Sequence, residues 1–198
     1  VDRCGLVGED GETHQGMFDV GYLRQVPGLK IYCPASFCEL SAMLRQAVLE
    51  DTGPVAVRYP RGGEGAYREN VKQTLLRPGT SCTVITYGTM INAVLEAADI
   101  AKKDGISTEI LKLRTISPVD WDAIAASCKK TGRVLVAEET SNRGCLADEI
   151  FAHLAERGIT GVFRKQNLGD DFVTHGAMQD LYRLTGLDAG ALAEKIRE

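Results

Sequence analysis

The 198-residue sequence contains no apolar run approaching the roughly 18 residues of a membrane-spanning helix, and no signal-peptide pattern. It also lacks an excess of positive charge: the formal net charge is -4, which argues against nucleic acid or an anionic membrane as a partner. Neither a Walker A loop nor G-x-G-x-x-G occurs, so no motif supports a nucleotide site. These absences predict a cytoplasmic globular protein that binds neither nucleic acid nor membrane.

Paired cysteine motifs are also missing. The six cysteines form no C-x-x-C and are scattered along the chain. We interpret them as reduced, small hydrophobic residues rather than a disulfide framework. No second ligand pair accompanies them, which disfavours structural zinc.

What the sequence does contain, from residue 81 onward, is a regular alternation of strand and helix patterns. The expected strands are 82–87, 107–113, 133–139 and 162–167. The expected helices are 91–103, 120–130 and 146–157, then two short ones, the last capped by Asp188. Strands separated by helical patterns of this length predict an α/β fold with right-handed βαβ units and a mostly parallel sheet.

The first block, residues 1–62, is less complete. It contains a strand pattern at 29–34, a helix that starts with the capping box Ser36-x-x-Glu39, and a strand at 55–58. Two strands and one helix cannot cover both faces of a sheet, so we expect part of a domain with uncovered apolar surface. The chain is therefore expected to be a piece of a longer protein.

A polar, glycine-rich stretch separates the two blocks. It reads "GGEGAYRENVKQTLLRPGT" and contains the turn pair Pro78-Gly79. We therefore predict three parts: 1–62, a linker at 63–80, and a second domain at 81–198.

The candidate site centres on "GEDGETHQG", residues 8–16, which contains Asp10 and His14. Arg3 opens this loop at an expected strand end, and Arg61 follows another strand. If those strands are neighbours, two guanidiniums and an imidazole meet at one rim, which suits a phosphate and a proton transfer. The alternative is a solvated, acidic turn with ordinary surface arginine pairs.

Other residues have weaker claims to a site. His153 lies beside an apolar helical stripe and is expected to be a packing or surface histidine, whereas Trp121, in the first turn of its helix, is expected to pack. His175 precedes a helix, so a role in a site stays open. Glu138 and Glu139 follow a strand and resemble a paired-carboxylate site, but capping or solvation is the preferred interpretation.

Longer stretches carry a family resemblance. "DRCGLVGEDGETHQGMFDVGYLRQVPGLKIYCP" resembles the pyrimidine-binding domain of the 1-deoxy-D-xylulose-5-phosphate synthase family, thiamine-diphosphate enzymes related to transketolase. The likeness continues through "GPVAVRYPRG", "YGTM", "LRTISPVD", "VAEE" and "TGLDAGALAEKI", and so covers essentially the whole chain. G-x-D-G-x-T-H-Q is shared with transketolases, whereas "FDVGYLRQVPGL" and "RYPRG" are more specific.

The resemblance implies a reaction and roles for four residues. Pyruvate is decarboxylated and joined to D-glyceraldehyde 3-phosphate, giving a precursor for isoprenoid, thiamine and pyridoxal synthesis. Arg3 and Arg61 match the arginines that hold the acceptor's phosphate. His14 matches a histidine that bonds the pyruvate-derived intermediate and helps proton transfer, and Asp10 matches the acid of the same wall.

The resemblance also implies that much of the enzyme lies elsewhere. The glutamate that activates thiamine diphosphate, and the domain that binds Mg²⁺ and the diphosphate, precede the matched stretch. We therefore expect no cofactor or metal ligand in this chain, and no activity from it alone. The C-terminal domain, matched by roughly 81–198, is expected to help form a homodimer.

Two other functions stay open. One is a transketolase, or a split relative whose partner subunit supplies the cofactor domain. The other is a free-standing dimerisation or phosphate-binding module without catalysis.

Overall fold

A small three-stranded sheet contains most of the regular structure of the first block. The computed structural model describes all 198 residues. The strand order is β2–β1–β6, with bounds β1 (Lys30–Tyr32), β2 (Val55–Val57) and β6 (Thr115–Ser117). β1 and β2 are parallel, whereas β6 is antiparallel to β1. The third strand therefore comes from the second block, which the sequence patterns did not indicate.

Helix α2 (Phe37–Leu49) connects β1 to β2, as its capping signal predicts. Ser36 Oγ accepts a hydrogen bond from the Glu39 amide at 3.2 Å. The Glu39 carboxylate bonds back to the Ala35 amide at 2.9 Å, one residue earlier than in an ideal capping box. Glu39 is fully buried and pairs with Lys112 at 2.6 Å, so the first turn of α2 is tied to the second block.

The second sheet has five strands in the order β3–β5–β4–β7–β8. Their bounds are β3 (Leu75–Arg77), β4 (Cys82–Tyr87), β5 (Thr108–Leu113), β7 (Arg133–Ala137) and β8 (Val162–Gln166). Every pairing is parallel except that of β3 with β5. The prediction of a mostly parallel sheet is confirmed. The stretch 63–80, expected as a linker, also contains the edge strand β3.

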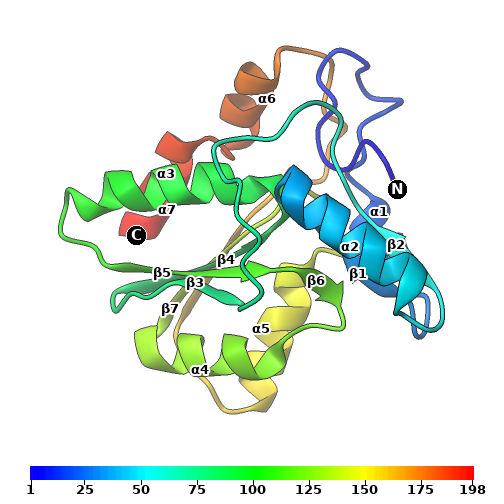
Figure 1. Cartoon of the computed structure of the whole chain (residues 1–198). Helices are drawn as coiled ribbons and strands as arrows, with labels where there is room; N and C mark the ends of the chain where they lie inside the picture. The colour runs from blue at the N-terminus through cyan, green and yellow to red at the C-terminus, as the bar shows by residue number, and fades with distance from the viewer.

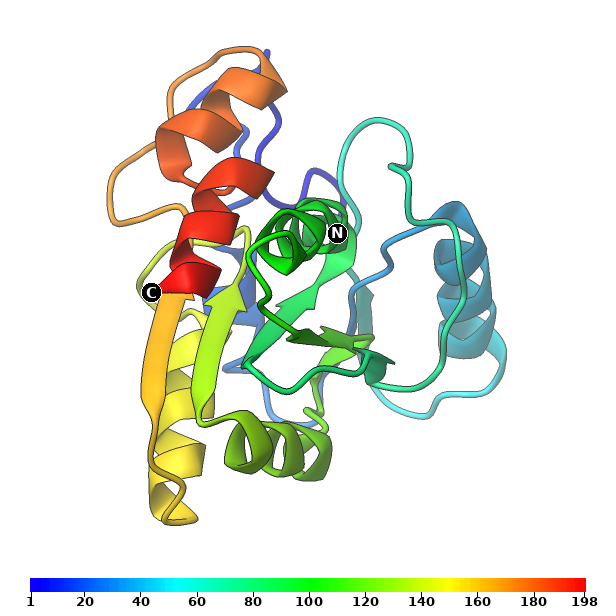
Figure 2. The same cartoon turned by 90° about the vertical axis from the view of Figure 1, so that its left-hand side faces the viewer.

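Helices cover both faces of this sheet (Figure 1). α3 and α7 lie on one face, and α4 and α5 lie on the other; the view turned by 90° shows the same layers (Figure 2). Their bounds are α3 (Ile91–Lys102), α4 (Trp121–Thr131), α5 (Leu146–Glu156) and α7 (Ala189–Arg197). Asp120 and Asp188 cap α4 and α7, and Gly132 ends α4 with a φ of 65°, as the sequence predicts.

Shorter helices complete the structure: α1 (Asp19–Leu23), the 3-10 turn η1 (Gly88–Met90) and α6 (Met178–Thr185). The packing roles expected for Trp121 and His153 are confirmed, because their rings stack with centroids 4.3 Å apart. None of the helices combines the length and the apolarity needed to cross a membrane.

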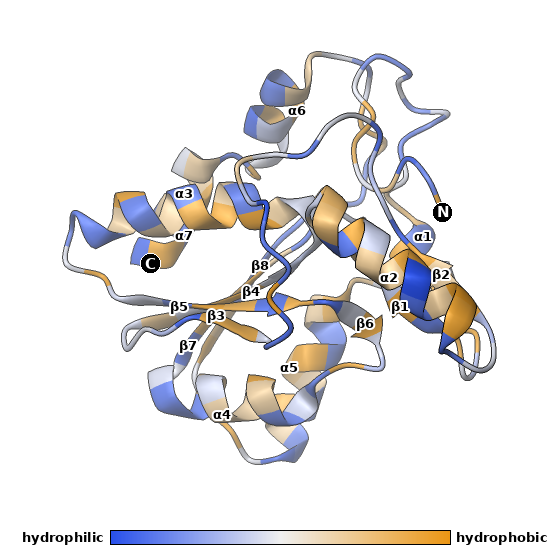
Figure 3. Ribbon diagram, in the orientation of Figure 1, coloured by the Kyte–Doolittle hydropathy of each residue, from blue (hydrophilic) through white to orange (hydrophobic).

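Two hydrophobic cores lie on opposite faces of the five-stranded sheet. Alternate residues of β7 point to them: Leu135 and Ala137 join one core, and Val134 and Val136 join the other. In Figure 3 several strands carry hydrophobic segments, whereas most helices are polar outside. Residues of the first block contribute to both cores, as Leu6 does to one and Ile31 to the other. The two sequence blocks therefore share their packing.

The apolar surface expected on the first block is present. On α2, four large hydrophobic side chains are 43–77% exposed, and orange segments mark this helix in Figure 3. They are Phe37, Leu44, Val48 and Leu49. None of the six cysteines is paired, and all except Cys38 are buried, in keeping with their interpretation as small hydrophobic residues.

Candidate functional site

The candidate site is built on the N-terminal loop, which we define as residues 1–16. Gly5 and Gly16 close this loop with two reciprocal backbone hydrogen bonds of 3.0 and 2.8 Å. A Cβ on Gly16 would lie 1.8 Å from the Arg3 carbonyl oxygen, so only glycine permits this approach. The Cys4 amide donates to the Tyr59 carbonyl at 3.1 Å, which places the loop beside the chain that leaves β2.

Arg3, Asp10 and Arg61 come together as the sequence predicts. Asp10 Oδ2 accepts hydrogen bonds from Arg3 Nη1 at 2.7 Å and from Arg61 Nη1 at 2.5 Å. Arg3 is not at a strand end but in irregular backbone, with a φ of 58° that residues other than glycine seldom adopt. The juxtaposition is thus achieved by backbone contacts between the loop and the segment after β2.

The two guanidiniums control the charge of Asp10. The hydrogen bond from Arg61 holds the pKa of Asp10 below its ordinary value, and the nearby charges of Arg3 and His14 act in the same direction. The same Arg61 bond raises the pKa of Arg61. The side chains of Arg3 and Arg61 remain 38% and 48% exposed, so their other N–H groups are accessible to a ligand.

His14 lies further along the same loop and is exposed. Its backbone amide donates to the Gly11 carbonyl at 3.1 Å. Its Nδ1 is within 2.8 Å of the Thr13 hydroxyl, which leaves Nε2 available to a ligand. This arrangement can offer one ring nitrogen for a hydrogen bond or a proton transfer.

A segment near the C-terminus packs against the N-terminal loop. Buried Gln15 accepts from the Val7 amide at 2.6 Å and donates to the carbonyls of Val173 and Thr174 at 3.4 and 3.3 Å. The Gly176 amide donates to the Gly8 carbonyl at 3.2 Å. The loop accordingly lies beside the segment that leads into α6 (Figure 1).

His175 belongs to this packing segment. A Cβ on Gly11 would lie 3.2 Å from His175 Cβ, so His175 sits against the backbone next to Asp10. Its side chain is exposed. The structure therefore brings His175 to the edge of the loop, and a chemical role for it stays a prediction.

Glu138 is a helix cap, as one of the sequence interpretations holds. Its carboxylate accepts from the Leu146 amide at 3.1 Å and the Ala147 amide at 2.9 Å, at the start of α5. It also accepts from the Tyr87 hydroxyl at 2.7 Å, and burial raises the pKa of Glu138. Solvation was the wrong alternative for both glutamates, because Glu138 is 0% and Glu139 5% exposed.

Glu139 contacts the candidate site, which the sequence reasoning missed. Its Oε1 accepts from the Leu6 amide at 2.8 Å and from the Tyr182 hydroxyl at 3.2 Å. Burial raises the pKa of Glu139 to about 7. The signal available in the sequence was only its place after a strand, because the contact joins residues far apart in the chain.

A buried ion pair lies beneath the site and was also missed. Arg58 donates to Asp19 at 2.7 Å, and both side chains are 3% exposed. Arg58 Nη2 also donates to the Glu139 backbone carbonyl at 3.0 Å. The position of Arg58 in the stretch "VRYPRG" was recognisable, but its burial was not.

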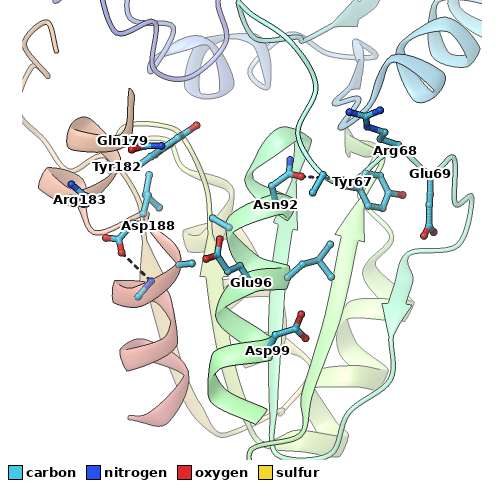
Figure 4. Close-up of a pocket in the computed structure, with 16 residues that line it drawn as sticks. Tyr67, Arg68, Glu69, Asn92, Glu96, Asp99, Gln179, Tyr182, Arg183 and Asp188 are labelled. Atoms are coloured by element: carbon cyan, nitrogen blue, oxygen red, sulfur yellow. Dashed lines mark hydrogen bonds between the residues drawn. The ribbon is translucent and has the colours of Figure 1, made fainter. Parts of the chain in front are cut away.

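A large cavity lies elsewhere, between α3, α6, α7 and the segment 66–69 (Figure 4). Its volume is about 960 Å³, and none of the four predicted site residues lines it. Two of its polar groups serve the fold: Asn92 accepts from the Tyr67 amide at 2.8 Å, and Asp188 caps α7. Tyr182, which lines this cavity, donates a hydrogen bond from its hydroxyl to the Glu139 carboxylate.

The family resemblance implies Mg²⁺ and thiamine diphosphate, whose binding would need suitably placed side-chain donors. No group of three or more His, Cys, Asp or Glu side chains is placed to hold a metal ion. Asp10, the carboxylate of the site, already pairs with two guanidiniums. The carboxylate of the candidate site is therefore not placed to hold Mg²⁺ with a diphosphate.

With this geometry established, comparison with known proteins defines the class. Residues 72–192 match the family described as "Transketolase, C-terminal domain", and residues 1–64 match "Transketolase, pyrimidine binding domain". The first match covers more than half of the chain, so the chain belongs to the transketolase family.

Within that class, the similarity is to curated 1-deoxy-D-xylulose-5-phosphate synthases. The chain is 43% identical to the synthase of Chlorobium phaeovibrioides and 40% identical to that of Chlorobium luteolum, each aligned over 100% of this chain. It covers 32% and 33% of those proteins. The chain thus spans about a third of the length of the relatives it matches.

Solved structures share the fold. A split gene transketolase, described as an inactive beta4 tetramer, superimposes with a TM-score of 0.83 at 24% identity, over 100% of this chain and 64% of that one. Transketolase from Campylobacter jejuni gives 0.76 at 20% identity, over 99% of this chain and 30% of that one. The fold class expected from the sequence is confirmed.

Proposed function

We propose that this chain is the acceptor-binding part of a 1-deoxy-D-xylulose-5-phosphate synthase. The observation that carries the proposal is the pairing of Arg3 and Arg61 on one carboxylate, Asp10. Two exposed guanidiniums held together by a carboxylate form a preorganised site for a phosphate. The names of the most similar relatives support the same assignment.

In this proposal, the whole enzyme condenses pyruvate, with loss of carbon dioxide, and D-glyceraldehyde 3-phosphate to 1-deoxy-D-xylulose 5-phosphate. Arg3 and Arg61 bind the acceptor's phosphate through the N–H groups that Asp10 leaves free. Asp10 keeps the guanidiniums close together before the ligand arrives. His14 Nε2 donates a hydrogen bond to, or exchanges a proton with, the oxygen that changes charge during bond formation.

The cofactor chemistry belongs to the rest of the longer protein. Thiamine diphosphate and Mg²⁺ are proposed for the whole enzyme, held by residues outside this chain. The chain's own task is to bind and orient the acceptor and to manage one proton. We also propose a homodimer in the bacterial cytoplasm for the whole enzyme.

Phosphate binding by the chain itself tests the site. We expect inorganic phosphate to bind the wild type by calorimetry, and Arg3→Ala and Arg61→Ala each to weaken binding by about 10–100-fold, since each removes charged hydrogen bonds. Arg68→Ala is the matched control: Arg68 is 72% exposed, and its only ion pair is with Glu64. Equal phosphate affinity in all four proteins would overturn the site.

The catalytic assignment needs the longer enzyme. His14→Ala is expected to lower kcat about 10²–10⁴-fold, with little effect on phosphate binding by the chain. Turnover at the wild-type rate would remove His14 from the chemistry.

A second candidate is a transketolase of the split kind, favoured by the likeness to the split gene structure. The two candidates differ in the donor. A panel of donors separates them: use of pyruvate supports the synthase, and use of a ketose phosphate with indifference to pyruvate supports transketolase.

A further inference from the structure

Glu139 is joined by its side chain to the N-terminal loop. It follows β7, on the five-stranded sheet, and its Oε1 accepts from the Leu6 amide at 2.8 Å. Gly5 lies directly over the carboxylate: a Cβ there would be 2.4 Å from Glu139 Cδ. The loop can approach the carboxylate this closely only because residue 5 has no side chain.

The backbone of Glu139 is hydrogen-bonded to the segment after β2, which carries Arg61. Its carbonyl oxygen accepts from Arg58 Nη2 at 3.0 Å. Arg58 precedes Arg61 in "RYPRG". Its buried ion pair with Asp19 holds the start of this segment in place. Glu139 therefore contacts both chain segments that carry the guanidiniums.

We propose that Glu139 is a positioning residue, whose carboxylate holds the Leu6 amide so that Arg3 and Asp10 meet Arg61. The proposal rests on the proposed phosphate site, because it names the residue that assembles it. Glu139 contacts no ligand; it acts through the loop. The Leu6 amide is buried at this bond, so a loop that lost it would leave an unpaired donor and shift to recover one.

The neighbouring Glu138 provides a matched control. It is equally buried and accepts two backbone amides, but these belong to α5 and not to the N-terminal loop. Removing either carboxylate disturbs the fold near the end of β7. Only the removal of Glu139 should disturb the arginine pair.

The test uses Glu139→Gln, Glu139→Ala and Glu138→Ala in this chain, with Asp10→Asn as the reference for a broken arginine pair. Two readouts apply: the NMR resonances of the Arg3 and Arg61 guanidinium N–H groups, and the dissociation constant for inorganic phosphate. Glu139→Gln keeps a side-chain oxygen that can accept from the Leu6 amide, because the two side chains have the same length. It should therefore retain the wild-type arginine resonances and the wild-type affinity for phosphate. Glu139→Ala should shift both resonances toward those of Asp10→Asn and weaken phosphate binding by about tenfold or more. Glu138→Ala should leave both unchanged.

Wild-type arginine resonances in Glu139→Ala would overturn the proposal. So would the same resonance shifts in Glu138→Ala, since they would indicate a general loss of structure. If Glu139→Ala does not fold, Glu139→Asp replaces it: the shorter side chain withdraws the acceptor from Leu6 and should shift the same resonances. A wild-type chain that binds no phosphate would refute the proposed function alone, because the resonances still report on positioning.

Discussion

At the scale of single residues, Gly5 is constrained both by its backbone conformation and by a neighbouring side chain. Its φ is 72°, and a Cβ there would overlap the Glu139 carboxylate at 2.4 Å. We expect Gly5→Ala to lower the free energy of unfolding by about 3–5 kcal/mol, measured by urea denaturation, because backbone strain and steric overlap add.

Gly28→Ala is the control for backbone strain alone. Gly28 has a φ of 74°, but nothing lies within 4 Å of the position of its Cβ. This variant should lose only about 1–2 kcal/mol. Equal losses at the two positions would mean that the carboxylate does not lie against Gly5.

Glu139 should make stability depend on pH. Burial raises its pKa from 4.5 to about 7. The groups around it are Arg58 and Asp19, which carry charge, and the Tyr182 hydroxyl and Cys4 thiol. Between the two pKa values the folded chain keeps a proton that the unfolded chain has released, so the free energy of unfolding falls as pH rises.

The expected size follows from the shift. At about 1.4 kcal/mol per pKa unit, Glu139 should account for a fall of roughly 3 kcal/mol between about pH 4.5 and 7.5. Urea denaturation of the wild type and Glu139→Gln at both ends of this pH range isolates the contribution of Glu139 to the free energy of unfolding. The glutamine amide does not titrate, so the difference between the two proteins gives that contribution. Parallel pH profiles for the two proteins would refute the prediction.

At the scale of elements, the start of α2 can be tested directly. Ser36 Oγ accepts from the Glu39 amide and donates to the Glu69 carbonyl at 2.9 Å. Ser36→Ala should cost about 1–2 kcal/mol of stability, because it removes a cap and a hydrogen bond to the 63–80 segment. Ser41→Ala, at an exposed position within the same helix, should change stability by less than about 0.5 kcal/mol. A similar effect at both positions would contradict the capping role.

The regular elements were predictable from local patterns, and the exceptions are short. Apolar periodicity located the long helices and the parallel strands, and the caps at Asp120 and Asp188 located the starts of α4 and α7. β6 has three residues, Thr115–Ser117, followed by proline, which is too little for an alternation pattern. α1 has five residues and no side-chain cap, so no signal marked it.

The contacts within the candidate site were predictable only in part. The sequence suggested that Arg3 and Arg61 would meet if two strand ends were neighbours; they do meet, on Asp10, but Arg3 lies in the N-terminal loop and not at a strand end. The contact between Glu139 and Leu6 was not predictable, because it depends on how the sheet and the N-terminal loop pack in three dimensions. Burial of Arg58 depends on the same packing.

At the scale of the whole molecule, the apolar side of α2 should affect behaviour in solution. Val48 is 77% exposed and Leu44 is 43% exposed on this helix. We expect Val48→Lys to lower concentration-dependent association in sedimentation and to reduce binding of an apolar dye, with little change in stability. Thr52→Lys adds the same charge at an exposed site without removing apolar surface. An equal effect of both variants would assign the change to charge alone.

The strand β6 has a consequence for how the chain can be divided. It lies within the segment matched to the C-terminal family, yet it pairs with β1 in the sheet of the other segment. A peptide-bond break at Gly63 would therefore leave two pieces that need each other, one lacking a strand and the other lacking the partner of that strand. Mixed after separate expression, residues 1–63 and 64–198 should recover the circular dichroism of the intact chain, whereas 1–63 alone should stay unfolded. The two pieces should therefore associate as a noncovalent complex, even without the peptide bond that links them in the intact chain.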